Sequence, residues 1–183
     1  MRHDCARRRP PNTSTEQFEK DLPVLIAACR ELADYAAQYG IVTSIENHGM
    51  HLQASERVRR LVLGVARPNF KTTIDVGNFV CVDEEPYFAV RDNLPFASFI
   101  HVKDFHRKPP AADPGEGWNR SSGGAWWRGA IAGHGDIDLP TIVRAIKASG
   151  YDGYLSLEFE GLEDPRLGCR IGLDNVKRYW REA

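Results

Sequence analysis

Four short apolar segments of this sequence each end in a side chain that can bind a metal ion. Their closing residues are Ser44-Ile45-Glu46, Thr73-Ile74-Asp75, Phe99-Ile100-His101 and Ser156-Leu157-Glu158. Three carboxylates and one imidazole form an oxygen-rich ligand set, which favours Mn²⁺ or Mg²⁺ and also suits Co²⁺ or Zn²⁺. The chemistry expected of these residues is therefore that of one divalent metal site.

The segments that carry these side chains have the length and composition of β-strands. They span residues 41–46, 70–75, 96–103 and 154–160, and they are rich in apolar, aromatic and β-branched residues. Helix-length segments separate them, and this alternation predicts an α/β fold with a parallel sheet and helical crossovers. In barrels of this kind the reactive groups lie where the strands end. The sequence therefore places the metal site at the mouth of a parallel barrel.

Strand geometry explains how the four side chains can meet. Side chains alternate between the two faces of a strand, so each ligand shares a face with the residue two positions before it. Neighbouring strands lie about 5 Å apart, which lets side chains from four strands converge on one ion. Glu158 and Glu160 share a face, and only one of them is expected to reach the metal. The residues expected to point the other way, toward the helices, are Ile45, Ile74 and Ile100.

Helices are expected between and after the strands. The first opens with a capping box formed by Thr13 and Glu16 and ends at Gly40. Asp138 is expected to cap another helix, which Gly150 ends. Apolar spacing and proline positions place the remaining helices around residues 58–65, over residues 83–93 and over residues 173–180.

The segment from residue 105 to residue 135 is too long for an ordinary connection between a strand and a helix. Loops of this length in compact domains are usually functional or disordered. Trp118, Trp126 and Trp127 argue against disorder. Two interpretations stay open, a lid that packs over a ligand and a surface excursion held by its own aromatic side chains.

Composition sets broad limits on the class of protein. The chain has 183 residues, of which 42% are apolar, and a formal net charge of −1. These values predict a single domain over residues 1–183 without a basic bias toward nucleic acid. The basic start, residues 1–9, lacks the apolar run of a secretory signal, and no stretch reaches membrane-spanning length, which predicts cytoplasmic residence. Four cysteines without a C-x-x-C pair give no support for a zinc knuckle or a disulfide framework.

The motifs around the four proposed ligands resemble a known group of enzymes. They are Ile45-Glu46-Asn47-His48-Gly49, Ile74-Asp75-Val76-Gly77-Asn78-Phe79, Ile100-His101-Val102-Lys103-Asp104, Gly133-His134-Gly135-Asp136-Ile137-Asp138 and Leu157-Glu158. Together they resemble the xylose isomerase-like TIM-barrel superfamily and, within it, the sugar phosphate isomerase/epimerase family. The resemblance covers residues 15–180 and implies a TIM (β/α)8-type barrel. It also implies that one divalent ion is bound by Glu46, Asp75, His101 and Glu158.

The resemblance implies a divalent-metal-dependent sugar or sugar phosphate isomerase or epimerase. Such an enzyme would act through an enediolate, with Glu46 and Glu158 as its acid/base pair. Its partner would be a small sugar or polyol rather than a nucleic acid or a membrane, and a homo-oligomer stays open. Alternatives are an inosose dehydratase, a hydroxypyruvate isomerase or a non-catalytic remnant. An apurinic endonuclease-like enzyme is disfavoured, because those proteins use three zinc ions and more histidines than the six present here.

Four further residues are expected to contact the substrate. His48 and Arg107 would orient it, and Arg107, six residues after His101, matches a position that binds substrate hydroxyls in the epimerases. Asn78 stands where ketose epimerases place a substrate-binding histidine, which counts against ketose epimerisation itself. Lys103 has two interpretations, a contact with a substrate carboxylate or phosphate and a salt bridge with Asp104 or Glu158.

The length of the chain predicts a partial barrel. Members of the superfamily have eight strands, whereas this sequence resembles roughly strands 4 to 8, and residues 1–5 resemble only the tail of the fourth. An open half barrel exposes sheet edges and apolar surface. We therefore expect a fragment of a longer enzyme in preference to two paired half barrels or completion by another chain.

Overall fold

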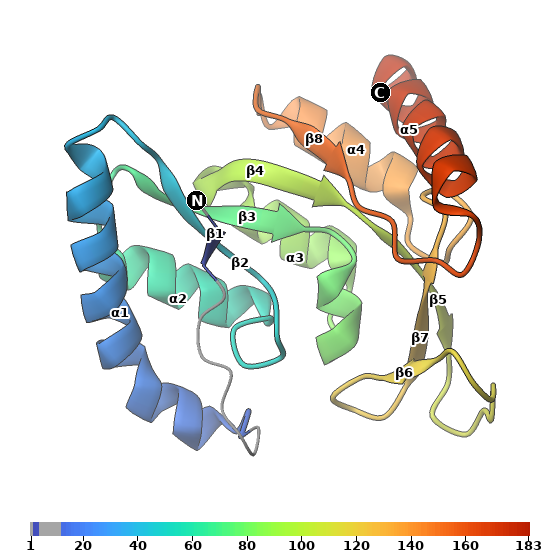
Figure 1. The fold of residues 1–183 in the computed structure, drawn as a ribbon, viewed down its shortest axis with the longest axis horizontal. Helices are drawn as coiled ribbons and strands as arrows, with labels where there is room; N and C mark the ends of the chain where they lie inside the picture. The colour runs from blue at the N-terminus through green and yellow to red at the C-terminus, as the bar shows by residue number, and fades with distance from the viewer. Residues whose placement is uncertain (1, 4–11) are drawn as a thin grey trace.

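The fold is built on one parallel sheet that does not close. The structure, a computed structural model, describes residues 2–3 and 12–183. Its main sheet has the strand order β1-β2-β3-β4-β8, and every neighbouring pair is parallel (Figure 1). The strands are β1 (Arg2–His3), β2 (Thr43–Glu46), β3 (Phe70–Asp75), β4 (Ala97–Val102) and β8 (Leu155–Leu157). Among the described residues β1 and β8 each pair with a single neighbour, so the predicted partial barrel is confirmed.

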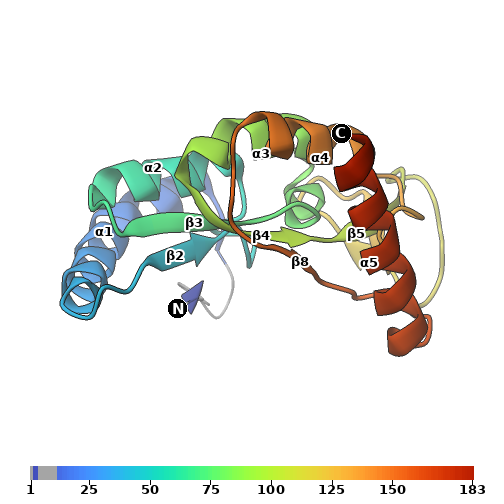
Figure 2. The same cartoon turned by 90° about the horizontal axis from the view of Figure 1, so that it is seen from above.

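Helices connect the strands and cover one face of the sheet. The α-helices are α1 (Thr15–Ala37), α2 (Ser55–Val65), α3 (Pro86–Asn93), α4 (Leu139–Ala148) and α5 (Pro165–Glu182). Two short 3₁₀ helices are η1 (Asn78–Val82) and η2 (Leu94–Phe96). Figure 2 shows α2, α3 and α4 above the sheet, with α1 and α5 at its two ends. This arrangement leaves the opposite face for the ligand side chains.

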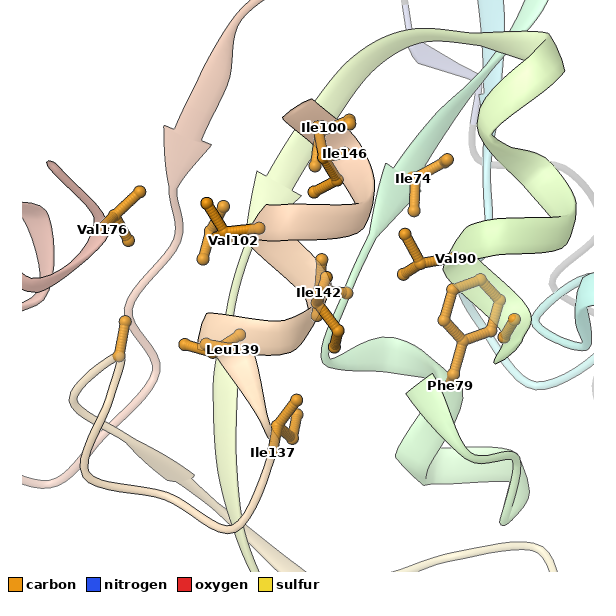
Figure 3. Close-up of a cluster of buried hydrophobic side chains, with 14 of the residues drawn as sticks. Ile74, Phe79, Val90, Ile100, Val102, Ile137, Leu139, Ile142, Ile146 and Val176 are labelled. Carbon is orange, nitrogen blue, oxygen red and sulfur yellow. The ribbon is translucent and has the colours of Figure 1, made fainter. Parts of the chain in front are cut away.

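The core lies between the sheet and these helices. The three isoleucines expected to face the helices are buried, each with no more than 1% of its surface exposed: Ile45, Ile74 and Ile100. Ile74 and Ile100 pack with Ile142 and Ile146 of α4, as Figure 3 shows. Strand alternation therefore assigned the two faces of the sheet correctly.

Several element boundaries differ from those expected. The side chain of Ser14, not that of Thr13, caps α1 by accepting a hydrogen bond from Gln17 N at 3.2 Å. Asp138 caps α4 as expected, because its carboxylate accepts from Thr141 N at 3.1 Å. The helix predicted over residues 83–93 starts only at Pro86, since Asp83 ends η1 with a left-handed φ of 60°. Likewise α5 begins at residue 165 rather than 173, and β8 is shorter than its predicted span.

The long segment after β4 is a second, antiparallel sheet rather than a loop without strands. It consists of β5 (Asp104–Lys108), β6 (Asn119–Arg120) and β7 (Trp126–Ala130) in the order β5-β7-β6. The rings of Phe105 and Trp127 lie 4.6 Å apart, and the Arg120 guanidinium lies 3.5 Å above the Trp126 ring. Aromatic contacts thus give the segment a fixed shape, while its role as a lid stays a prediction.

Two further expectations concern the first strand and membrane-spanning helices. Arg2–His3 pairs with β2 as the predicted strand tail should, whereas residues 1, 4 and 5 of that tail lie outside the described residues. No helix in the described part of the chain is both long and apolar enough to cross a membrane.

Truncation of Ile100 should destabilise the fold more than truncation of an exposed isoleucine. Ile100 has no exposed surface, so Ile100→Ala should lower the free energy of unfolding by about 2–5 kcal/mol through the cavity it leaves. Ile41 is 47% exposed, and Ile41→Ala should change that free energy by about 0.5 kcal/mol or less. Urea unfolding curves of the two variants test this, and equal effects would contradict the packing described.

Candidate metal centre

The four predicted ligand residues meet at one end of the parallel sheet. A ligand atom of each lies within 4.8 Å of those of the other three: Glu46, Asp75, His101 and Glu158. The first three are in β2, β3 and β4, and the fourth directly follows β8. Asp75 and His101 are register partners across β3 and β4, so the parallel pairing itself brings their side chains together.

The imidazole of His101 lies among the three carboxylates. Its Nδ1 is 3.2 Å from Glu158 Oε2, 3.4 Å from Glu46 Oε1 and 3.8 Å from Asp75 Oδ2. Glu46 and Asp75 are buried, whereas His101 and Glu158 are partly exposed. The cluster is therefore closed on the side of β2 and β3 and open on the side of β8.

Backbone groups fix one oxygen of Asp75 and leave the other directed into the cluster. Asp75 Oδ1 accepts hydrogen bonds at 2.9 Å from the N–H groups of Gly77 and Asn78, where η1 begins. Asp75 Oδ2 accepts from no backbone group and lies 3.1 Å from Lys103 Nζ and 3.8 Å from His101 Nδ1. The start of η1 thus orients the carboxylate without using the oxygen that faces His101.

Asn47 holds the ends of β2 and β3 together. Its Nδ2 donates to Asp75 O at 2.8 Å, and Asp75 N donates to its Oδ1 at 2.7 Å. The amide therefore replaces a backbone pair at the point where the strands end. Sequence reasoning gave this residue no role, although its position directly after Glu46 is a signal that could have found it.

Lys103 is buried against the same carboxylates. Its Nζ lies 3.1 Å from Asp75 Oδ2, 3.2 Å from Glu158 Oε2 and 3.3 Å from Glu160 Oε1. The structure thus contains the Glu158 salt bridge of one interpretation, while a substrate contact stays a prediction. Asp104, the other partner considered, accepts instead from backbone N–H groups of Phe105, Gly133, Gly135 and Ile137.

The pKa shifts of the cluster follow from its burial and crowding. Burial raises the pKa of Asp75 to about 7, although Lys103 acts against this shift. The carboxylates of Glu158 and Glu46, which accept hydrogen bonds from its imidazole, raise the pKa of His101 to about 9. The hydrogen bond with His101 is the main cause that lowers the pKa of Glu158. Burial would lower the pKa of Lys103, but the carboxylates, Asp75 first, outweigh burial and raise it.

The residues present fit a divalent cation. Asp75 Oδ2, His101 Nδ1 and Glu158 Oε2 are buried, and their close polar contacts are with one another and with Lys103. Buried carboxylates are stable only when a nearby positive charge or hydrogen-bond donors compensate them. A divalent ion would compensate these atoms, and carboxylate oxygens with one imidazole suit Mg²⁺, Mn²⁺ or Zn²⁺. The geometry therefore favours a metal centre over a purely structural cluster.

The expected substrate-contacting residues lie in different surroundings. His48 is half-buried directly after β2, and Asn78 is buried at the start of η1, where its Nδ2 has no hydrogen-bond partner. Arg107 lies on β5, 3.4 Å from Glu85, and lines an open cavity of about 310 Å³ together with Lys108. The structure thus brings Asn78 and Lys103 to the cluster and places Arg107 on the second sheet.

Comparison with known proteins identifies the family. The family model described as the xylose isomerase-like TIM barrel matches residues 6–179. The chain belongs to this family. The resemblance expected from the sequence motifs is therefore confirmed, and so is the fold class.

Individual members of the xylose isomerase-like TIM barrel family are distant from this chain. An inosose dehydratase of Lacticaseibacillus casei is 24% identical over 156 residues, which are 85% of this chain and 50% of that protein. A xylose isomerase-like TIM barrel protein of Mycobacterium smegmatis, solved in complex with magnesium, is 19% identical with a TM-score of 0.70 and coverages of 93% and 58%. The 3-keto-D-glucoside 4-epimerase of E. coli is 19% identical with a TM-score of 0.66 and coverages of 94% and 59%.

The chain spans about half the length of the curated relatives it matches. The family-model match over residues 6–179 includes all four candidate ligands.

Divalent metal should stabilise the chain through His101. Excess Mn²⁺ at about 100 times its Kd should raise the free energy of unfolding by about 2.7 kcal/mol relative to EDTA, because the ion binds only the folded form. His101→Gln should remove most of this gain, since the cluster loses its only nitrogen ligand. Thermal melts in EDTA and in Mn²⁺ measure the effect.

The matched control is His106→Gln on β5, which lies outside the cluster. This variant should respond to Mn²⁺ as the wild type does. An equal response of both histidine variants would show that the ion binds elsewhere.

Loss of the Asn47 amide should weaken both the fold and the metal centre. Asn47→Ala leaves two backbone groups of Asp75 without their partners, which should cost about 2–4 kcal/mol of unfolding free energy. The affinity for Mn²⁺, measured by calorimetric titration, should fall because Asp75 is no longer held. Asn119→Ala on exposed β6 is the control. Unchanged stability and affinity in Asn47→Ala would refute this role.

Proposed function

We propose that this chain carries the metal centre of a divalent-metal-dependent isomerase or epimerase that acts on a sugar or sugar phosphate. The observation that carries the proposal is the convergence of three carboxylates and one imidazole at the ends of four parallel strands. Metal binding and acid/base chemistry need these groups at this position. The family match supports the same class of enzyme.

Glu46, Asp75, His101 and Glu158 would hold the ion. When bound, it supplies positive charge that stabilises the negative charge formed on substrate oxygens as a proton leaves the carbon beside a carbonyl. Mn²⁺ or Mg²⁺ is the expected metal because oxygen ligands predominate.

Glu46 and Glu158 would move the proton. Glu46 is the last residue of β2 and Glu158 directly follows β8, and β3 and β4 lie between those strands in the sheet. The two carboxylates therefore reach the centre from opposite sides, so that one can remove a proton and the other can return it to the same or a neighbouring carbon. The substrate would pass through an enediolate between the two transfers.

Polar side chains around the cluster would orient the substrate. Asn78 Nδ2 is buried without a partner, which makes it a donor for a substrate hydroxyl or carbonyl oxygen. Lys103 supplies positive charge beside Glu158, and His48 stands two residues after the end of β2. Arg107 would contact the substrate from β5. This donor-rich surrounding suits a sugar or polyol better than an apolar ligand.

Loss of a hydroxyl group is the second candidate reaction. The similarity to an inosose dehydratase over 85% of this chain favours it. The same carboxylates would remove the proton, and hydroxide would then leave from the next carbon. Assays with ketoses, inososes and hydroxypyruvate under the same conditions distinguish these activities.

The barrel wall beyond β1 and β8 would also be needed for turnover. Among the described residues the sheet is open at both edges, and relatives of about twice the matched length have further chain available to close it. A longer protein or another copy of the chain would supply this wall. Without it the substrate would remain exposed to water on one side.

In an assembly or longer protein that closes the barrel and turns over substrate, Glu158→Gln should abolish turnover without unfolding the chain. The amide keeps the size of the side chain but cannot exchange a proton near neutral pH, so the rate should fall about 10²–10⁴-fold. Substrate conversion and deuterium uptake from solvent would be measured together. Glu182→Gln, an exposed site on α5, is the control. Wild-type activity in Glu158→Gln would remove Glu158 from the mechanism.

A further inference from the structure

Lys103 has an unusual location for a lysine beside a candidate metal centre. It follows β4 two residues after His101, and only 2% of the residue is exposed. Its stem runs across Gly77, where a Cβ atom would lie 2.9 Å from Lys103 Cγ. The ring of Phe105 lies 5.9 Å from the ammonium. The side chain is therefore held in one place rather than extended into solvent.

Oxygen atoms of four residues surround the ammonium. Its Nζ lies 3.1 Å from Asp75 Oδ2, 3.2 Å from Glu158 Oε2, and 3.3 Å from both Glu160 Oε1 and Asn78 Oδ1. Three carboxylates and one amide oxygen around a point are also the ligands that hard divalent cations prefer. The ammonium thus occupies the centre of an oxygen site built like a cation site.

Two of these carboxylates, those of Asp75 and Glu158, also belong to the four-residue cluster of candidate metal ligands. Asp75 Oδ2 and Glu158 Oε2 face Lys103 Nζ, and they also face His101 Nδ1 at 3.8 and 3.2 Å. In sites with two metal ions, the ions lie about 3.5–4 Å apart and hold the reacting oxygens between them. An ion held by the four clustered ligands would therefore share two carboxylates with the ammonium of Lys103, which lies beside it in the place of a second cation.

We propose that the ammonium of Lys103 stands in place of a second metal ion and keeps the centre mononuclear. The inference rests on the proposed function, in which the four clustered ligands hold one ion. It also explains why Glu158 and Glu160, which share a face of the strand, make different contacts. Glu158 joins the metal cluster, whereas Glu160 is engaged by Lys103. A covalently attached cation cannot dissociate, so the charge at this position does not depend on metal supply.

Removal of the ammonium should open the second cation position. Lys103→Ala leaves the shared carboxylates and a space where the side chain was, so the variant should bind two Mn²⁺ ions where the wild type binds one. Equilibrium dialysis followed by elemental analysis gives the stoichiometry. Electron paramagnetic resonance tests whether the two Mn²⁺ ions are magnetically coupled, as ions sharing carboxylates would be. Lys71→Ala on β3 is the control and should bind one ion.

The outcomes separate this inference from the proposed function. One ion in both the wild type and Lys103→Ala would overturn the inference and leave the metal centre intact. A wild type that binds none would overturn both. Two uncoupled ions in the variant would also overturn it, because the second would lie elsewhere.

Stability supplies a second test should Lys103→Ala fold poorly in EDTA. Carboxylates left without the ammonium repel one another, so Mn²⁺ should restore folding, and the gain should rise with the logarithm of Mn²⁺ concentration about twice as steeply as in the wild type. A variant that Mn²⁺ does not restore, or that shows the wild-type slope, would contradict a second cation site.

Discussion

Crowding of negative charge at the end of the sheet is the constraint on which the site depends. Three carboxylates and an imidazole offer ligand atoms within 4.8 Å of one another, and two of the carboxylates are buried. Such a cluster is unstable unless nearby groups compensate it. The compensating groups include the ammonium of Lys103 and the two backbone N–H groups, of Gly77 and Asn78, that donate to Asp75. The negative charge that these groups leave uncompensated is available to bind a metal ion.

Separate elements of the surrounding structure hold the ligand-bearing segments in place. Asn47 connects the ends of β2 and β3, and the start of η1 binds one oxygen of Asp75. Asp104 organises the segment before α4 through backbone N–H groups of Gly133 and Gly135. None of these contacts uses the atoms that face His101. In Asp75, for example, the backbone and Oδ1 are held by hydrogen bonds, whereas Oδ2 faces the cluster and can bind an ion.

Much of the site could be predicted from the sequence because parallel strands obey simple rules. Alternation gave the face of each side chain, and strand ends gave the shared location, which placed Glu46, Asp75 and His101 correctly in space. Alternation could not choose between Glu158 and Glu160, which share a face; the family resemblance selected Glu158, and the structure places it in the cluster. The antiparallel β5–β7–β6 sheet was missed because its strands are short and lie among prolines and glycines. The start of α5 was missed because the spacing of apolar residues is weak before residue 173, although Asp164 and Pro165 form a good start signal.

The attachment of the second sheet to η1 has a mechanical consequence. Asp83, at the end of η1, accepts hydrogen bonds at 2.6 Å from Ser121 Oγ and Gly123 N, beside the turn that joins β6 to β7. The other end of η1 binds Asp75. A displacement of that turn is therefore transmitted along one short helix to a candidate metal ligand. Insertions near residues 113–117, away from this connection, would leave the ligand undisturbed, so the outer part of this segment is mechanically separate from the candidate metal centre.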